Sequence, residues 1–294
     1  MKPVKPVKLV HTIAELRAEL DGARARGATV GFVPTMGALH AGHRSLVERA
    51  VADCDVVAVS IFVNPLQFGP SEDLDAYPRT LDADVAMVAE VGAAVAFAPP
   101  VAEMYPRPAL TRVRVEGVSE PLEGASRPGH FDGVATVVAK LFHLAGPCRA
   151  YFGEKDWQQL AVIRRMAEDL NFPVEVVGCP TVREPDGLAL SSRNAYLTAE
   201  ERAAAPVVAK ALREGAALVE AGERSPAAVR DLMRRTIEAE PLARLDYAEI
   251  VDAATLQPVD PLEGELRLLA AVRFGRARLI DNLGVHAHRY PAGP

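Results

Sequence analysis

The sequence predicts an α/β protein with a doubly wound parallel sheet, followed by a second, smaller α+β domain. In the first half of the 294-residue chain, short apolar runs alternate with segments of helical periodicity, which is typical of βαβ units. After about residue 182 an alanine-, glutamate- and arginine-rich stretch is followed by strand-like segments. We therefore expect a Rossmann-like domain over 1–181 and a smaller α+β lid domain over 182–294. Ligands of the first domain should bind at the carboxyl ends of its strands.

Strands of the first domain are expected where valine, alanine and aromatic residues concentrate, because strands covered by helices on both faces are apolar throughout. The helices between them follow from the spacing of apolar residues. The predicted strands are 28–33, 55–63, 93–98, 149–152 and 174–178, and the predicted helices are 12–26, 42–53, 81–91, 132–145 and 157–170.

In the second domain, two helices are predicted between Thr198 and Glu240, with a break near Gly222 and Ser225. The linker before them is placed in "REPDGLALSSRN", which contains proline and glycine. The closing "HAHRYPAGP" is predicted to be a frayed tail. The predicted strands of this domain are 245–252, 265–274 and 277–285.

The composition narrows the class of protein. Apolar residues make up 49% of the chain, enough for a sizeable core, and a formal charge of -6 argues against a general nucleic-acid binder. Cys54, Cys148 and Cys179 form no C-x-x-C pair, which suits a reducing compartment. No apolar core of a signal peptide follows the first residues, and no uncharged run approaches the ~20 residues of a membrane span. We expect a cytoplasmic protein that binds neither nucleic acid nor membranes.

The stretch "PTMGALHAGHRS" places His40 and His43 on a glycine-rich turn between a predicted strand and a predicted helix. It is not a P-loop, because His43 and Arg44 stand where G-x-x-x-x-G-K-[ST] requires Lys and a hydroxyl. A helix N-terminus favours anions, and imidazoles there can stabilise the charge that develops when a nucleotide's α-phosphorus is attacked. A zinc-binding pair and two structural histidines in a turn are the alternatives, and the motif alone leaves them open.

Two more segments place polar groups after predicted strands. "IFVNPLQFG" ends in Asn64 and Gln67, amides that can hold a small polar substrate. "RAYFGEKDWQQL" carries Lys155 for a phosphate, Asp156 for ribose hydroxyls and Gln159 in the first turn of a helix. An ordinary turn at Asn64, and a solvated loop in which Asp156 caps the helix, are the alternatives.

Cationic residues also occur in two loops. "GLALSSRN" offers two hydroxyls and Arg193, which can clamp a phosphate bidentately on a loop able to close over a nucleotide. "EGASRPGHFDGV" places Arg127 and His130 ahead of a predicted helix. The alternatives are a surface turn in which Ser192 or Asn194 begins the next helix, and a loop with one salt bridge.

Together these segments resemble one family, the pantoate–β-alanine ligases, over nearly the whole chain. The motifs "PTMGALHAGH", "SIFVNPLQF", "DAYPRT", "RPGHFDGV", "FGEKDWQQL" and "DGLALSSRN" occur in that family's order and spacing. The resemblance implies a first domain related to the H-x-G-H nucleotidyltransferases, a smaller hinged second domain, and usually a homodimer.

The resemblance also implies the reaction and its substrates, which are ATP with Mg²⁺, pantoate and β-alanine. The pantoate carboxylate attacks the α-phosphate of ATP, giving pantoyl adenylate and pyrophosphate. The amine of β-alanine then attacks the acyl carbon, giving pantothenate and AMP.

The same resemblance assigns roles to individual residues. His43 is implied to be the proton donor and His40 its phosphate-binding partner, with Lys155 and Arg193 completing the catalytic set. Gln67 and Gln159 are implied to hold pantoate, and Gln67 to lie near β-alanine as well. The residues implied to bind ATP are Met36, Gly37, Ala38, Leu39, His40, Ala41, Gly42, His43, Gly153, Glu154, Lys155, Asp156, Val182, Leu190, Ser191, Ser192 and Arg193.

The chain departs from the family after "YPRT". Some relatives carry an acid pair and a glutamine associated with magnesium there, whereas this chain has Ala83, Asp84 and Met87. We therefore assign no protein ligand to the metal, and expect Mg²⁺ to arrive on ATP with most of its waters.

Two other functions stay open at this point. One is another H-x-G-H nucleotidyltransferase with a phosphate acceptor, against which the neutral amides of Gln67 and Gln159 argue. The other is a non-catalytic ATP-binding protein, which predicts a broken catalytic set.

Overall fold

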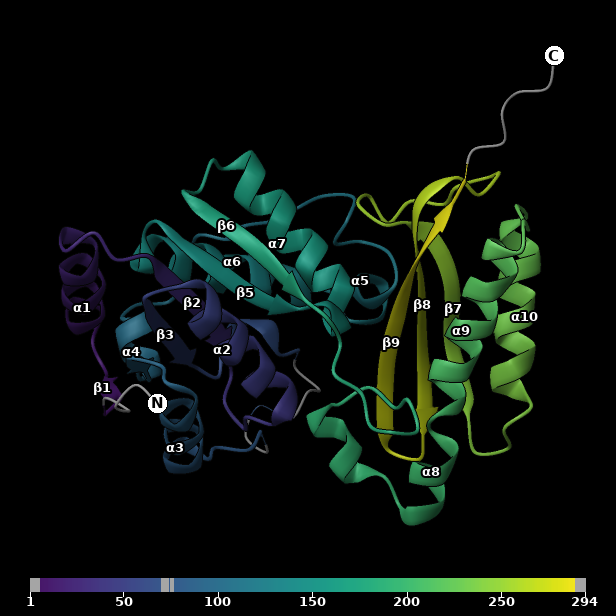
Figure 1. The fold of residues 1–294 in the computed structure, drawn as a ribbon, viewed down its shortest axis with the longest axis horizontal. Coiled ribbons are helices and arrows are strands. Elements are labelled where there is room, and N and C mark those ends of the chain that lie inside the picture. The colour runs from purple at the N-terminus through teal and green to yellow at the C-terminus, as the bar shows by residue number, and fades with distance from the viewer. Residues whose placement is uncertain (1–5, 70–73, 75–76, 289–294) are drawn as a thin grey trace. The chain divides into compact units, whose positions relative to one another are not determined.

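The computed structural model describes residues 6–69, 74 and 77–288, which form two compact units (Figure 1). The first unit holds the described residues up to Glu154 together with Gln159–Pro180, and the second holds Lys155–Gln158 and the described residues from Thr181 onward. Lys155–Gln158 therefore pack with the second unit although they lie within the first in sequence. The domain limits 1–181 and 182–294 stay a prediction.

The first unit is built on six strands, which are β1 (Lys8–Val10), β2 (Val30–Thr35), β3 (Val56–Ile61), β4 (Val95–Phe97), β5 (Cys148–Gly153) and β6 (Val174–Cys179). They form a parallel sheet in the order β1-β4-β3-β2-β5-β6. From β2 the chain runs to β3 and β4, and it then returns to place β5 on the other side of β2. The direction of winding thus reverses between β2 and β5, which is where doubly wound sheets bind ligands.

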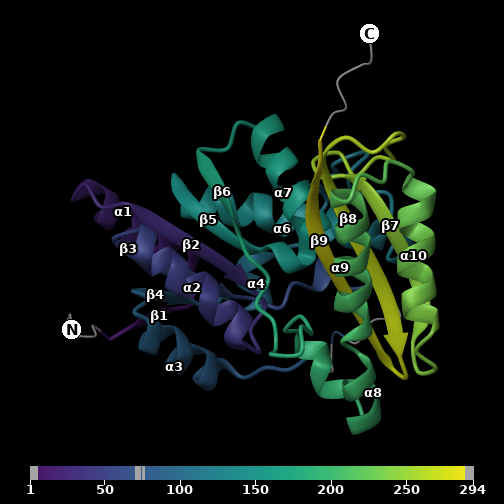
Figure 2. The same ribbon diagram turned by 45° about the vertical axis from the view of Figure 1, so that its right-hand side comes forward.

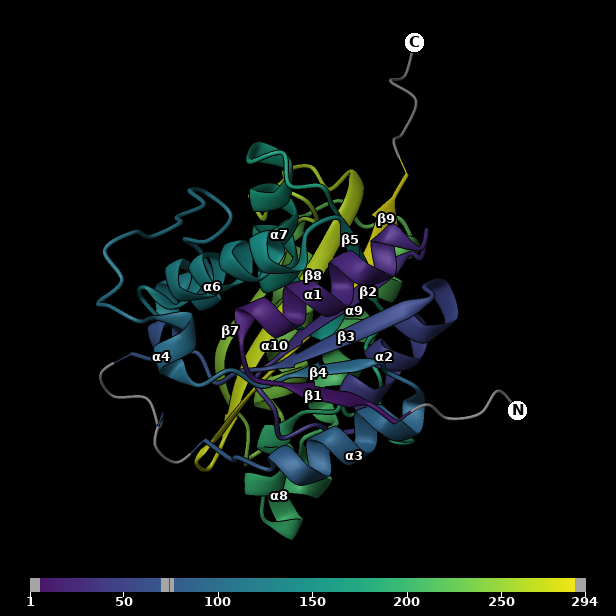
Figure 3. The ribbon, with the colours of Figure 1, turned by 90° about the vertical axis from the view of Figure 1, so that its left-hand side faces the viewer.

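Helices cover both faces of this sheet, as Figure 3 shows. They are α1 (Ile13–Ala25), α2 (Ala41–Asp53), α3 (Leu81–Val91), α4 (Val101–Met104), α5 (Glu123–Ser126), α6 (His130–Ala145) and α7 (Trp157–Asp169), with 3-10 turns η1 (Pro65–Gln67) and η2 (Glu154–Asp156). Helices α1 and α6 contact each other on one face, and α2 and α3 contact each other on the opposite face. The predicted doubly wound class is confirmed.

An apolar core fixes the strands from which the functional loops emerge. Val33 of β2 and Val59 of β3 are fully buried, and they belong to one cluster with Val47 and Ala50 of α2. These side chains lie in the valine- and alanine-rich runs that predicted strands covered on both faces. The loops that follow β2 and β3 therefore start from a rigid base.

The second unit contains an antiparallel sheet in the order β7-β8-β9. Its strands are β7 (Arg244–Asp252), β8 (Gly264–Phe274) and β9 (Ala277–Ala287), and its helical segments are η3 (Ser192–Tyr196), α8 (Ala199–Ala204), α9 (Val207–Glu220) and α10 (Pro226–Glu238). Helices α9 and α10 pack on each other, α9 against β8 and β9 and α10 against β7 (Figure 2). The smaller α+β architecture is confirmed.

Two sequence-based predictions for the second half were wrong. The 198–240 region has an additional break, which lies between α8 and α9 at Pro206. Proline has no N–H to donate within a helix, and its ring clashes with the carbonyl group four residues before it. The supposed frayed tail begins too early, since β9 continues to Ala287 and His286 pairs with Glu265. The segment predicted as the linker contains a bridge between Arg183 and Ala189, and its role as a linker stays a prediction.

Three short elements of the first unit have no counterpart among the predicted strands and helices. Strand β1 and helices α4 and α5 were not predicted, because segments of three or four residues are too short to show a period. Asp75 and Ala76 of the "DAYPRT" motif, and residues 289–294 of the predicted tail, lie outside the described residues. Within the part of the chain that the structure describes, no helix has the length and apolarity needed to cross a bilayer.

Candidate active site

The turn between β2 and α2 is held in place by a buried carboxylate. Asp84, in the first turn of α3, is 2% exposed, and its two oxygens accept hydrogen bonds from the backbone N–H groups of Ala38 (3.0 Å) and Leu39 (2.8 Å). Gly37 and Ala38 have positive φ angles of 87° and 51°. A Cβ on Gly37 would lie 3.0 Å from the Asp84 carboxylate, so this position needs glycine for both conformation and space. The carboxylate therefore fixes the backbone of the predicted ATP-binding turn.

In the segment after "YPRT", where the chain departs from the family pattern, Asp84 is the acidic residue that remains of the acid pair that some relatives carry. These bonds show its role. Both Asp84 oxygens face N–H donors, and Thr80 donates its hydroxyl to one of them at 3.2 Å. Among the described residues, no group of three or more His, Cys, Asp or Glu side chains is arranged to hold a metal ion. The structure thus assigns Asp84 to the backbone of the turn.

His40 and His43 form the capping box of α2. His40 is the N-cap residue, and its Nδ1 accepts a hydrogen bond from the N–H of Gly42 at 3.1 Å. The Nδ1 of His43 accepts from the N–H of His40 at 3.4 Å, and the two ring centroids are 4.2 Å apart. Because both Nδ1 atoms accept, each neutral ring carries its proton on Nε2. Two Nε2–H donors therefore sit at a helix N-terminus, where anions are favoured.

The loop after β3 brings Gln67 against the turn after β2. The Nε2 of Gln67 lies 2.9 Å from the Sδ of Met36, so two predicted site residues from different loops are in contact. Asn64 supports this arrangement from a position that is 1% exposed. Its Nδ2 donates to the Oε1 of Gln67 (3.2 Å) and to the carbonyl of Gly133 (3.1 Å), and Tyr105 donates its hydroxyl to the Oδ1 (2.9 Å). Asn64 thus supports the side chain of Gln67 from a buried position.

Arg127 and His130 act on the same loop. His130 donates from Nδ1 to the backbone carbonyl of Gln67 at 2.9 Å, and its Nε2 accepts from Arg127 at 2.9 Å. The "RPGHFDGV" motif indicated cations near a helix start, but it gave no sign of their partner. His130 thus helps to hold the backbone of a predicted pantoate-binding residue, and Arg127 contacts His130 from the other side of its ring.

The structure places the predicted residues of the first unit around three adjacent strands. Met36–His43 follow β2, Gln67 follows β3, and Gly153, Glu154 and Gln159 end or follow β5. Since β3, β2 and β5 are neighbours and parallel, their carboxyl ends share one edge of the sheet. The point between β2 and β5 at which the direction of winding reverses lies on this edge.

The remaining predicted residues belong to the second unit. Lys155 pairs with Asp156 at 3.2 Å, and its side chain is 16% exposed. The N–H of Leu190 donates to the carbonyl of Val182 at 2.9 Å. Ser191 is the N-cap of η3, a segment that contains Ser192 and Arg193, and its hydroxyl accepts from the N–H of Arg193 at 3.3 Å. The catalytic set expected from the sequence is therefore divided between two units, with the histidines on the first and the cations on the second.

The fold and the histidine-capped turn define an α/β enzyme of the kind that handles nucleotides at the carboxyl edge of a parallel sheet. Comparisons identify the family. A family profile described as pantoate-beta-alanine ligase matches residues 8–284. Pantothenate synthetase of Heliobacterium modesticaldum is 55% identical over 279 residues, covering 95% of this chain and 99% of that protein.

Solved structures agree with the sequence comparison. Pantothenate synthetase from Thermus thermophilus has a TM-score of 0.89 and 53% identity, over 95% of this chain and 100% of that one. The pantoate-beta-alanine ligase from Francisella tularensis, complexed with beta-gamma ATP and beta-alanine, has a TM-score of 0.77 and 34% identity, over 94% and 97% of the two chains. The chain belongs to the pantoate–β-alanine ligase family. It is an enzyme that joins pantoate to β-alanine, and the resemblance drawn from its motifs is confirmed.

Proposed function

We propose that the chain carries out this ligation in two steps at the residues described above. Pantoate and ATP first give pantoyl adenylate and pyrophosphate, and the amine of β-alanine then displaces AMP to give pantothenate. The observation that carries the proposal is the capping box of His40 and His43 at the sheet's carboxyl edge. The related ligase from Francisella tularensis, complexed with beta-gamma ATP and beta-alanine, supports ATP and β-alanine as substrates.

The first step requires cations and hydrogen-bond donors, because a carboxylate must approach a triphosphate of like charge. His43 is the proposed proton donor to the phosphate region, and His40 is its phosphate-binding partner. Their Nε2–H groups donate where charge develops on the α-phosphate oxygens. Lys155 and Arg193 are the proposed cationic partners of the phosphates, with Arg193 able to bind two oxygens through its planar fork.

Gln67 and Gln159 are the proposed pantoate ligands, since neutral amides can donate to a carboxylate and accept from hydroxyls. Gln67 is also proposed to lie near β-alanine. Its position is supported on the backbone side by His130 and on the side-chain side by Asn64. Holding the reactants in line supplies an entropic advantage of up to about 7–11 kcal/mol in well-oriented systems, so no covalent enzyme nucleophile is needed.

ATP is proposed to contact the turn after β2 and the two segments on the second unit. The proposed contact residues are Met36–His43, Gly153–Asp156, Val182 and Leu190–Arg193. Mg²⁺ is proposed to enter on ATP, where it neutralises part of the triphosphate charge. The engagement of both Asp84 oxygens by backbone donors supports a metal held chiefly by phosphate and water.

Three further properties complete the proposal. The 182–294 domain is proposed to act as a lid that keeps the adenylate from hydrolysis. The enzyme is proposed to be a homodimer, as the family resemblance implies, and to lie in the cytoplasm, as its cysteine usage suggests. Analytical ultracentrifugation of the purified protein tests the dimer directly.

The experiment that tests the two-step reaction is pyrophosphate release from ATP and Mg²⁺, measured first with pantoate alone and then with β-alanine added. We expect about one equivalent per site with pantoate, followed by sustained turnover and AMP formation when β-alanine is present. His43→Ala should lose the first phase, whereas His286→Ala, on β9, should retain both. ATP binding without pyrophosphate release in either condition would instead support a nucleotide sensor.

A further inference from the structure

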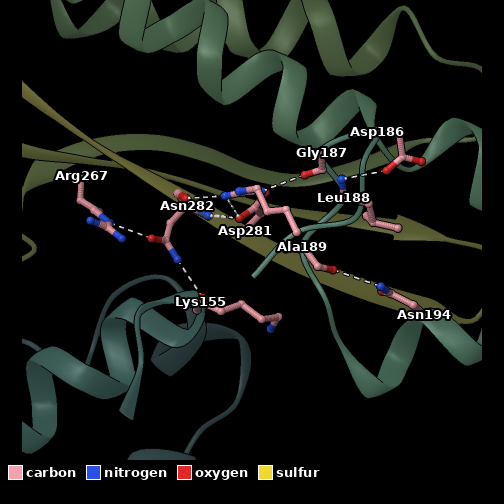
Figure 4. A network of polar contacts seen from close by, with 10 residues as sticks. Lys155, Asp186, Gly187, Leu188, Ala189, Asn194, Arg267, Asp281 and Asn282 are labelled. Carbon is pink, nitrogen blue, oxygen red and sulfur yellow. Dashed lines mark hydrogen bonds and ion pairs between the residues drawn. The ribbon is translucent and has the colours of Figure 1, made fainter. Parts of the chain in front are cut away.

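Two adjacent polar residues of β9 contact the Lys155 segment and the hairpin that leads to the Arg193 segment (Figure 4). Asp281 is 5% exposed and Asn282 is 3% exposed. Neither was identified from the sequence as part of the site.

Asp281 anchors the hairpin of residues 182–190, which precedes η3. Its carboxylate accepts from both terminal nitrogens of Arg183, at 2.6 and 2.9 Å, which is the bidentate geometry of a strong charge-assisted pair. Arg183 also donates to the carbonyl of Gly187 at 3.0 Å and to that of Asn282 at 3.3 Å. One buried carboxylate thus ties the hairpin to the sheet.

This hairpin leads directly into the segment that carries Arg193. Val182 and Leu190 pair across it, and Leu188 inserts into the apolar core of the second unit. At its end, Asn194 donates from Nδ2 to the carbonyl of Ala189 at 3.0 Å. The position of the 190–193 segment is therefore set by the hairpin that Asp281 anchors.

Asn282 acts on the other segment through its side-chain amide. Its Oδ1 accepts from the Nε of Arg267 at 2.7 Å, and its Nδ2 donates to the backbone carbonyl of Lys155 at 2.7 Å. The guanidinium can only donate and the carbonyl can only accept, so the amide has one possible orientation. An apolar residue at position 282 would leave the Arg267 and Lys155 groups without these bonds.

A cation–π contact between Arg267 of β8 and Trp157 of α7 strengthens this arrangement. The Arg267 guanidinium lies over the ring of Trp157, 3.6 Å from its centroid, and Trp157 donates from Nε1 to the carbonyl of Ala253 at 2.8 Å. Trp157 is two residues after Lys155. The Lys155 segment is thus held to the sheet at both its carbonyl and its neighbouring indole.

We propose that Asp281 and Asn282 are positioning residues for the reaction, with Asn282 placing Lys155 and Asp281 placing the segment of Arg193. This inference rests on the proposed function, in which Lys155 and Arg193 bind the phosphates of ATP. A buried polar pair is weak evidence for stability alone, because apolar residues often stabilise a core as well or better. A displacement of about 1 Å in a phosphate-binding group can cost on the order of 100-fold in rate.

The first test compares Asn282→Ala with wild type in steady-state kinetics, reporting KM for ATP, KM for β-alanine and kcat. We expect kcat/KM for ATP to fall about 10- to 100-fold while KM for β-alanine changes little. Asp246→Asn is the matched control, since it removes a carboxylate charge that pairs with Arg278 in the same sheet and alters neither segment. Should Asn282→Ala not fold, Asn282→Asp keeps the shape but turns an oxygen toward the Lys155 carbonyl.

The second test is a double-mutant cycle with Lys155→Ala, in which the dissociation constant of ATP is measured. This constant can be determined even if the Lys155→Ala variant has no activity. If Asn282 acts through Lys155, Asn282→Ala weakens ATP binding in the wild-type background but not in the Lys155→Ala background. Equal weakening in both backgrounds would show a merely structural role and overturn the proposal. Full activity of Lys155→Ala would instead refute the role of Lys155 in the proposed function, which is a distinguishable result.

Discussion

The role of Asp84 in the structure differs from the role that its motif suggests. From the sequence it looks like the remnant of a magnesium-binding group, because Ala83 and Met87 cannot ligate a metal. In the structure its carboxylate satisfies two backbone donors of the Ala38–Leu39 turn. The sequence could not predict these partners, because a backbone N–H leaves no signature in the amino-acid type.

We expect Asp84→Ala to weaken ATP binding, because it leaves two N–H groups without their acceptor at a cost of about 1–3 kcal/mol each. KM for ATP should rise about 10-fold or more, while KM for β-alanine should change less. Asp82→Ala is the control, since Asp82 is an exposed carboxylate in the same helical turn. Unchanged ATP kinetics in Asp84→Ala, with the fold intact by circular dichroism, would contradict this role.

At the scale of the element, α2 combines a structural and a chemical function in its first turn. His40 is the N-cap and His43 is the third residue of the helix, so the spacing of H-x-G-H is also the spacing of a capping box. Gly42 is required between them, because a Cβ there would lie 2.8 Å from the Cε1 of His40. The alternative of structural histidines is therefore compatible with, and not opposed to, the phosphate interpretation.

Substitution of His40 separates the two functions. Asn is among the best N-cap residues, so His40→Asn should retain the stability of the protein, whereas His40→Ala should lose about 0.5–2 kcal/mol in the free energy of unfolding. Both variants lack the Nε2–H donor and should lose most pyrophosphate release. Urea unfolding and the pyrophosphate assay measure the two effects, and normal turnover by His40→Asn would exclude His40 from catalysis.

Helix α6 positions the Gln67 loop by close approach. A Cβ on Gly133 would lie 2.2 Å from the carbonyl oxygen of Leu66, so Gly133→Ala must displace η1. We expect KM for pantoate to rise more than KM for ATP, because Gln67 moves while the turn after β2 keeps its own support. Gly22→Ala, in α1, is the control, because its Cβ would meet only the end of the Arg26 side chain at 3.5 Å. That control should gain roughly 0.5–1 kcal/mol of stability. An equal rise in both constants for Gly133→Ala would argue against this selective effect.

The elements that sequence predicted best are those with an unambiguous period. The helix expected over 81–91 is α3 itself, because its apolar positions repeat on one face and Gly92 ends it in a left-handed conformation. The alanine-rich run after Thr198 was less informative, since alanine marks no face and Pro206 alone signalled the break. The spacing of apolar residues therefore predicted that a segment is a helix, and the capping residues predicted where the helix begins and ends.

At the scale of the whole molecule, the fold class was predictable while the network around the cations was not. Short apolar strands alternating with helices specify a doubly wound sheet almost regardless of the individual residues. The bond between Asn282 and the Lys155 carbonyl joins positions 127 apart in sequence, and a hydrogen bond of this kind requires only one side chain. Motif matching finds the groups that meet substrate, but it does not find the residues that hold those groups.

Burial of two thiols predicts how the stability of the molecule depends on pH. Desolvation raises the pKa of Cys148 to about 12 and that of Cys179 to about 11, from an ordinary value near 9.0. The folded state thus keeps protons that the unfolded state releases above pH 9. This contribution to stability is fully present below the unfolded pKa and is lost as pH rises through the folded pKa values.

We therefore expect the free energy of unfolding to fall steadily between pH 9 and about pH 11, measured from urea midpoints at each pH. Other buried groups also titrate there, since desolvation raises the pKa of Tyr105 to about 12. The cysteine contribution is isolated by the variant that carries both Cys148→Ala and Cys179→Ala, whose stability should fall less steeply over the same range. Parallel pH profiles for the variant and the wild type would mean that both thiols ionise as readily in the folded protein as in the unfolded chain.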